Sequence, residues 1–194
     1  MGSYAGPEIR RVNRWNCFHK SKLWLADTNL TGWLSVYAAS TPGCELFNAA
    51  SSVMGDHDVP QPDAALRITP ESGGQSNNAG EYVGGAPELI VEVSGSITSR
   101  DLGVKLDLYR RSGVREYLTI LIKPRQVIWR QLVRGRYKEV LPSEDGLIRS
   151  ATFPGLWLDP ESVWKPEAAL RTILEGVRSP EHAAFVRRLA TRRH

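Results

Sequence analysis

Cysteine and long hydrophobic runs are both scarce in this sequence of 194 residues. Its two cysteines, Cys17 and Cys44, match no zinc-binding spacing and are too few for a disulfide framework, so we expect two reduced structural thiols. No apolar run approaches the roughly 18 residues that a membrane-spanning helix needs. The first residues, MGSYAGPEIRRVNRW, lack the apolar middle of a secretory signal, so we expect a cytoplasmic protein with no membrane partner.

Three widespread catalytic motifs are also missing. The sequence contains no G-x-S-x-G elbow, no Walker phosphate-binding loop and no H-E-x-x-H helix, which removes the common alternatives that these motifs mark. The composition, with 41% hydrophobic and 24% charged residues, is that of an ordinary globular protein. A chain of this length predicts one domain with a sizeable core.

The net charge of +4 hides two halves of opposite sign. Residues 23–99 carry nine acids against one base, whereas residues 100–138 carry eleven bases against three acids. This division suits a polyanionic substrate handled through metal ions, because carboxylates hold the cations and bases hold the phosphates. The alternative is that the basic residues form a solvated helix face and loops.

The hydrophobic periodicity predicts a single α/β domain with a mixed sheet. The predicted elements, in chain order, are a helix over 21–39, strands over 45–50 and 64–68, an exposed flexible loop over 71–85, a strand over 88–93, a helix over 100–112, a strand over 116–122, a hairpin of 126–133 with 136–141, a strand or turn near 148–153 and a C-terminal helical segment.

Glu92 is a lone carboxylate at the centre of the apolar segment LIVEV. A buried, unpaired carboxylate costs several kcal/mol unless it is protonated, paired or bound to a metal. The two-residue period of a strand places Ile90 and Glu92 on the same face. The alternative is a strand-end position, where Glu92 points to solvent or pairs with an arginine.

Asp63 and Lys105 are the other candidates for the same site. Asp63 directly precedes the apolar run AALRI, so adjacent strands would let Asp63 and Glu92 converge on one Mg²⁺, which takes one or two carboxylates plus waters and phosphates. Lys105 follows Asp101 by four residues on the predicted helix. If its ammonium points back over the end of the Glu92 strand, it can orient a metal-bound water and stabilise charge on a phosphate. The alternatives are a turn residue for Asp63 and a surface ion pair with Asp101 for Lys105.

Two stretches, PQPDAALRI and GGAPELIVEVSGSITSRDLGVKLDLYRRSGVREYL, resemble the Uma family of restriction endonuclease-like proteins in the PD-(D/E)XK nuclease superfamily. The resemblance continues through VIWRQLVRGRYKEV and LIRSATFPGLWLDP and covers roughly residues 19–165. It implies Asp63 and Glu92 as metal ligands, with the Val93 main-chain carbonyl as a third. It also implies that Lys105 is the catalytic lysine, moved to the following helix from the superfamily position that Ser94 occupies here.

The resemblance implies a restriction-endonuclease-like fold, a mixed central β-sheet flanked by helices. We expect a flexible N-terminal arm over 1–18, a nuclease-like domain over 19–165 and a C-terminal helical extension over 166–194. The expected function is hydrolysis of DNA phosphodiester bonds by an endonuclease that uses Mg²⁺ or Mn²⁺, and the superfamily suggests a homodimer by analogy. The alternative is a catalytically inactive module that keeps the fold and binds nucleic acid or protein.

Two further sets of side chains complete the predicted site. The candidates for contacts to substrate phosphates are Arg100, Arg110 and Arg111. The candidate accessory residues are His19, Asp101 and Tyr109. For Tyr109 the alternative is a place in the core, and for His19 a role at the helix start or on the surface.

Overall fold

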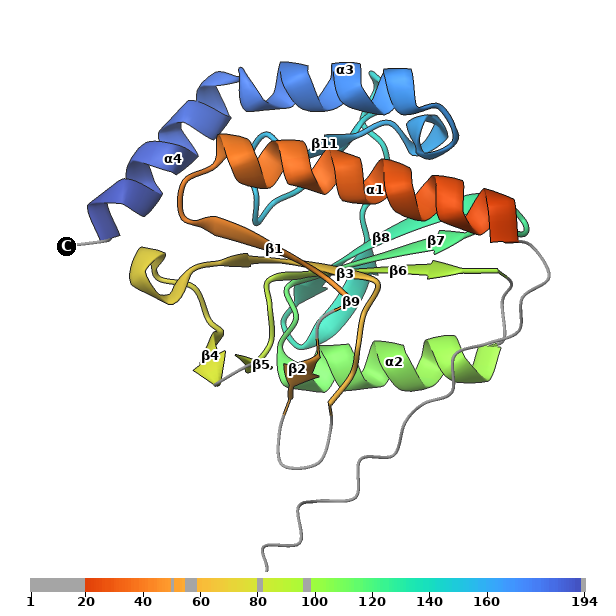
Figure 1. Cartoon of the computed structure of the whole chain (residues 1–194), viewed down its shortest axis with the longest axis horizontal. Coiled ribbons are helices and arrows are strands. Elements are labelled where there is room, and N and C mark those ends of the chain that lie inside the picture. The colour runs from red at the N-terminus through yellow and green to blue at the C-terminus, as the bar shows by residue number, and fades with distance from the viewer. Residues whose placement is uncertain (1–19, 50, 55–58, 80–81, 96–98, 193–194) are drawn as a thin grey trace, which may run out of the picture.

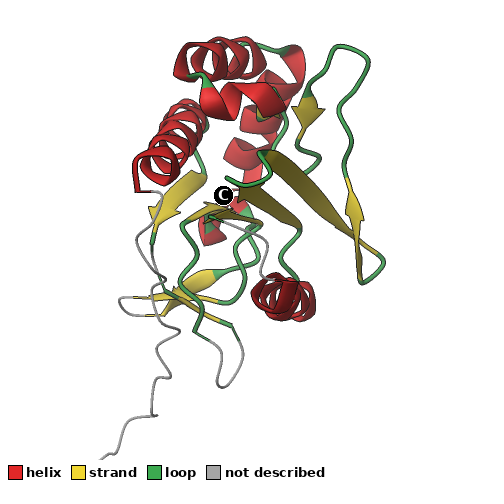
Figure 2. Ribbon diagram, turned by 90° about the vertical axis from the view of Figure 1, so that its right-hand side faces the viewer, coloured by secondary structure: helices red, strands yellow, loops and turns green. Residues whose placement is uncertain are grey.

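A six-stranded mixed sheet forms the centre of the protein, with α1, α3 and α4 on one face and α2 on the other (Figure 1). The computed structural model describes residues 20–49, 51–54, 59–79, 82–95 and 99–192. The expected arm over 1–18 therefore lies outside the described residues. The mixed sheet flanked by helices is the fold class that the sequence predicts, and Figure 2 shows the same layers from the side.

The helices and strands follow the predicted order. They are α1 (Lys20–Ser40), β1 (Cys44–Asn48), β2 (Ser52–Val53), β3 (Ala64–Ile68), β4 (Asn77–Ala79), β5 (Tyr82–Gly84), β6 (Leu89–Ser94), α2 (Ser99–Ser112), β7 (Glu116–Leu121), β8 (Gln126–Val133), β9 (Arg136–Glu139), β10 (Ile148–Arg149), β11 (Trp157–Leu158), α3 (Pro166–Val177) and α4 (Pro180–Arg192). No described helix has both the length and the apolar character needed to cross a membrane.

The strand order in the central sheet is β1-β3-β6-β7-β8-β9. Only β6 and β7 are parallel, and α2 connects them as a crossover helix, since parallel neighbours need such a connection. The other neighbours are antiparallel, and β8 and β9 form the predicted hairpin. β6 and β7 lie in the middle of the sheet. The C-terminal end of β6 lies at the same end of the molecule as the first turns of α2 (Figure 1).

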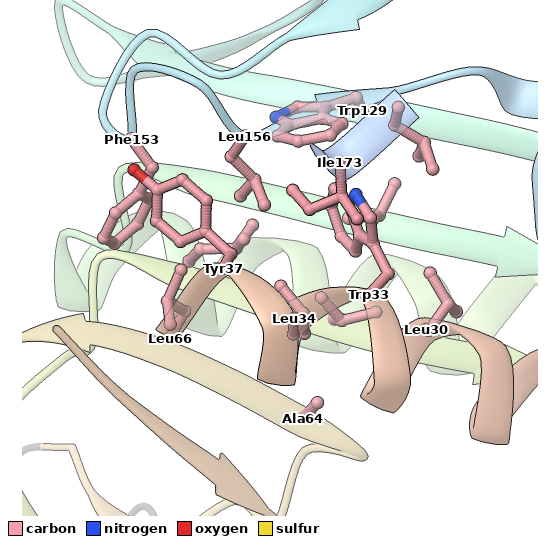
Figure 3. Packing of buried hydrophobic residues seen from close by; sticks show 14 of the residues in the cluster. Leu30, Trp33, Leu34, Tyr37, Ala64, Leu66, Trp129, Phe153, Leu156 and Ile173 are labelled. Carbon is pink, nitrogen blue, oxygen red and sulfur yellow. The ribbon is translucent and has the colours of Figure 1, made fainter. Parts of the chain in front are cut away.

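The larger part of the core lies between the sheet and α1. Apolar residues recur at helical spacing along α1, which turns one stripe toward the sheet (Figure 3). Its buried members are Ala26, Leu30, Trp33, Leu34 and Tyr37. The Trp33 ring meets Trp129 of β8 edge to face at a centroid distance of 6.0 Å. The segment predicted as a C-terminal extension joins this core through Ile173, Phe185 and Leu189.

A smaller cluster lies on the opposite face, beneath α2. It contains Ile90 of β6, Tyr109 of α2 and Tyr117 of β7, whereas Leu89 and Val91 of β6 belong to the larger core. The two-residue period predicted for β6 is therefore confirmed. It turns Glu92 toward α2, on the same face as Ile90.

The prediction of a loop over 71–85 is wrong in part, because β4 and β5 form a three-stranded sheet with β2. Polar contacts hold this segment. The buried Arg67 donates to the Asn77 carbonyl and the Asn78 side chain, and the carboxylate of Glu88 accepts from the backbone N–H of Gln75. Hydropathy periodicity cannot indicate strands that depend on such contacts. Of the two cysteines, Cys44 is buried at the start of β1, and Cys17 lies outside the described residues.

Candidate active site

Asp63, which directly precedes β3, lies beside the end of the neighbouring strand β6, where Glu92 is located. In the antiparallel pair of β3 and β6, Ala64 is the partner of Val91, so extending the register by one residue places Asp63 opposite Glu92. Asp63 Oδ2 also accepts a 2.7 Å hydrogen bond from the Val93 backbone N–H, which holds the aspartate against β6.

Lys105 and Tyr109 reach Glu92 from α2. They are four residues apart and therefore lie on one side of the helix. Lys105 Nζ donates to Glu92 Oε2 at 2.6 Å, and the Tyr109 hydroxyl donates to Glu92 Oε1 at 2.7 Å. Glu92 is 6% exposed, whereas about a third of the Lys105 side chain is open to solvent. One nearly buried carboxylate is thus held by a partly exposed cation and by a phenol.

The electrostatic balance at Glu92 is set by opposing influences. Burial raises the pKa of the Glu92 carboxyl, the ammonium of Lys105 lowers it, and the nearby Asp63 carboxylate raises it again. Burial also raises the pKa of the Tyr109 hydroxyl, so this group stays protonated and acts as a donor. The site therefore contains two carboxylates that disfavour each other's charge and one cation that offsets part of this repulsion.

Asp27 of α1 lies near Asp63 and was not among the residues predicted for the site. Burial, and then the charge of Asp63, raise the pKa of Asp27. Both acids line an open pocket of about 370 Å³, with Thr28, Thr31, Asn48 and Ala49. A signal was present in the sequence, because Asp27 is the only charged residue between Leu23 and Ser40. An isolated charge in an otherwise uncharged stretch is a candidate for the same reason as Glu92.

The predicted phosphate contacts do not join the acids. Arg110 and Arg111 both pair with Asp107 on the solvent side of α2, at 2.7 and 2.9 Å. The side chains of Arg100 and Asp101, and the whole of His19, lie outside the described residues. Tyr109 combines the two alternatives given for it, because its ring is fully buried in the core while its hydroxyl contacts Glu92.

The donors at this end of the sheet have the chemistry of a site for a hard divalent cation. No three His, Cys, Asp or Glu side chains in the described part of the chain gather closely enough to hold a metal ion by themselves. Mg²⁺, however, commonly takes one or two carboxylates and completes its shell with waters and substrate phosphates. The Val93 carbonyl can add a main-chain oxygen, because its N–H faces Asp63 and both groups of a strand residue point the same way. Asp63, Glu92 and this carbonyl therefore fit such an ion.

Comparisons with known proteins give one family and one fold. A crystal structure described as a "putative nuclease belonging to DUF820" from Anabaena variabilis is similar to this chain with a TM-score of 0.62 and 12% sequence identity, over 79% of this chain and 86% of that one. No curated protein matches the chain. The model of the Uma2 family matches residues 21–161, which is well over half of the sequence. The chain therefore belongs to the Uma2 family, whose description is "Putative restriction endonuclease".

Proposed function

We propose that this protein is a Mg²⁺-dependent endonuclease that hydrolyses phosphodiester bonds of DNA. The observation that carries the proposal is the contact of Lys105 with Glu92 on the strand next to Asp63. As a surface partner of Asp101 alone, Lys105 would have no reason to reach a buried strand. Instead it crosses from α2 to the sheet and meets Glu92, a carboxylate whose pKa is raised by burial and by the nearby Asp63.

Asp63, Glu92 and the Val93 carbonyl are the proposed ligands of the cation. A bound divalent cation supplies polarisation of a phosphoryl oxygen and a lower pKa for a water molecule. About a third of the Lys105 side chain is exposed, and its Nζ carries two N–H donors besides the one that Glu92 accepts. They can orient the attacking water and offset the negative charge that develops on the phosphate. Tyr109 fixes the position of Glu92.

The family and the nuclease-like fold support this assignment. The division of charge supports it as well, since the acids of the site come from residues 23–99 and the bases that follow come from residues 100–138. A phosphate backbone needs both, because cations must offset its charge wherever no metal does so.

A plasmid-nicking assay with Mg²⁺, Mn²⁺ and EDTA tests the proposal. Wild-type protein is expected to cut with either metal and to be inactive in EDTA. Lys105→Ala is expected to cut about 10²-fold more slowly, a loss of about 2.7 kcal/mol of transition-state stabilisation. Glu92→Gln, which removes a ligand charge and keeps the shape, is expected to lose the metal-dependent activity.

Arg171→Ala is the matched control, because it removes one exposed helical cation on α3, away from the site. It is expected to cut like the wild type. Equal cutting by Lys105→Ala and the wild type would contradict the role of Lys105. A wild type that binds DNA with a steep salt dependence and never cuts it would favour the inactive binding module instead.

A further inference from the structure

The β8–β9 hairpin carries a group of cations outside the candidate active site. Its tip and its edge strand surround an open hollow of about 500 Å³. The lining residues are Val133, Arg134, Arg136 and Lys138. Three of these four side chains are positively charged and all three are exposed, so the hollow presents cations and a short apolar wall to whatever enters it.

These three cations lack carboxylate partners among the described residues. None of them occurs in the ion pairs of the described part of the chain, whereas Arg110 and Arg111 share Asp107. Neighbouring cations repel one another, so a surface group without counter-charges attracts an anion from solution. An anion with a repeating charge satisfies several such groups at once.

Arg134 occupies a backbone position that does not suit arginine. Its φ is +50°, and Gly135 follows with a φ of +76°, so both residues of this two-residue turn are left-handed. Asn or Asp followed by Gly is preferred in such turns, because other side chains are strained there. The chain thus places a cation at the tip at the expense of local stability, and an arginine at such a position calls for a role outside folding.

The hairpin tip lies at the opposite end of the sheet from Asp63 and Glu92. It contacts α2, the helix that also carries Lys105. Thr119 pairs with Glu92 on one side and Ile128 on the other, and Arg134 lies six positions beyond Ile128 along β8 and its turn. At about 3.3 Å per residue this is about 20 Å, or about six base pairs of a duplex. Arg110 Nη1 donates to the Gly135 carbonyl at 3.3 Å, which links the end of α2 to the tip.

We infer that this hairpin surface, formed by Arg134, Arg136 and Lys138, binds the phosphodiester backbone of duplex DNA several base pairs away from the scissile bond. The inference rests on the proposed function for the choice of DNA as the polyanion. The cations contact phosphates and read no bases, so they add affinity and orientation without sequence preference. With the duplex fixed at this second point, one strand is held against the acids.

Binding of a fluorescein-labelled 30-base-pair duplex in EDTA, followed by anisotropy over a range of salt concentrations, tests the inference without cleavage. The test variant combines Arg134→Asn, Arg136→Gln and Lys138→Gln. It is expected to bind about tenfold more weakly at 100 mM salt. The slope of log Kd against log salt is expected to fall by up to about 2.7, at about 0.9 for each phosphate that the variant no longer neutralises.

The matched control combines Arg171→Gln in α3, Arg178→Gln directly after α3 and Arg187→Gln in α4. All three cations are exposed, and the control changes the net charge equally. It is expected to keep the wild-type slope. Arg134→Asn alone adds a readout of the strain: its melting temperature is expected to rise by about 2 °C while its affinity for DNA falls.

Equal losses in both triple variants would overturn the inference, because they would reflect net charge alone. Unchanged binding by the hairpin variant would also overturn it, and aggregation of that variant would then assign the cations to protection of the edge strand β9. Absence of DNA binding by the wild type at 50 mM salt would overturn both the inference and the proposed function. A wild type that never cuts, with the loss of slope confined to the hairpin variant, would refute the proposed function and leave the inference standing.

Discussion

Glu92 and Glu116 are both buried glutamates on the two parallel strands, but different donors hold them. Glu116, 1% exposed, accepts on one oxygen from Trp129 Nε1 and Ser150 Oγ. On the other oxygen it accepts from the backbone N–H groups of Ala151 and Thr152. Among the described residues, the donors to Glu92 are Lys105 and Tyr109, and a second carboxylate, Asp63, lies nearby.

The two sets of donors indicate different roles for the two buried carboxylates. The four neutral donors of Glu116 come from the sheet and from one loop, so this glutamate ties residues 150–152 to the start of β7. Its pKa is raised by burial, and the donors oppose that rise. Glu92 lies toward the opposite end of its strand, where its partners are a partly exposed cation and a phenol. Burial is common to both residues, and the donor set separates the structural anchor Glu116 from Glu92, the proposed metal ligand.

Substitution of each glutamate by glutamine is expected to give the largest contrast. In Glu116→Gln, whichever oxygen becomes an NH₂ group meets two donors, so we expect the free energy of unfolding to fall by about 3 kcal/mol. In Glu92→Gln, the amide oxygen can face Lys105 and the NH₂ can face Tyr109, whose hydroxyl also accepts. We expect a change below about 1 kcal/mol there. Urea unfolding of both variants measures the contrast.

Cleavage is expected to show the opposite order. At a temperature where Glu116→Gln is still folded, it is expected to cut at close to the wild-type rate, whereas Glu92→Gln is expected to be inactive. A stable Glu116→Gln variant without activity would remove the distinction between the two glutamates.

The sequence predicted the order of the helices and strands because period-two and helical patterns depend on burial along one element. It also selected Glu92, since a charge between apolar residues is visible in one dimension. It passed over Glu116, which precedes an equally apolar run, because its donors are 13 to 36 residues away. The contact of Lys105 with Glu92 could not be predicted for a similar reason. The residue spacing in α2 shows which helix face carries Lys105, but its partner depends on how α2 crosses the sheet.

Removal of one hydroxyl donor from the surroundings of each glutamate tests the comparison further. Tyr109→Phe and Ser150→Ala each delete a 2.7 Å donor to a buried carboxylate. Each is expected to lower the free energy of unfolding by about 2 kcal/mol, as for a hydrogen bond to a charged group. Only Tyr109→Phe is expected to slow cleavage, by about tenfold. Equal cleavage rates in the two variants would place Tyr109 with the purely structural donors.

Asp27 tests whether the site extends beyond the two strands. Asp27→Asn removes an acid that lines the same pocket as Asp63, so we expect the Mg²⁺ concentration for half-maximal cleavage to rise about tenfold, or about 1.4 kcal/mol. The rate at saturating Mg²⁺ is expected to change little. Asp107→Asn, on the solvent side of α2, is the matched control and is expected to leave the Mg²⁺ requirement unchanged.

His182 is a buried basic side chain that, like Glu116, has a structural role. Its titration is expected to change the free energy of unfolding least among these predictions. It is 4% exposed, and its Nε2 lies 2.9 Å from the Thr41 hydroxyl, which ties α4 to the end of α1. Burial lowers the pKa of the imidazole, while a hydrogen bond with the Val177 backbone and the charge of Glu181 oppose this. The unfolded chain therefore binds the proton first as pH falls, so the free energy of unfolding decreases below about pH 6.5, by at most about 0.8 kcal/mol at pH 6.0. Urea unfolding at pH 7.5 and 6.0 is expected to show this decrease in the wild type and to lack it in His182→Gln. An identical pH dependence in both proteins would mean that His182 titrates alike in the folded and unfolded chain.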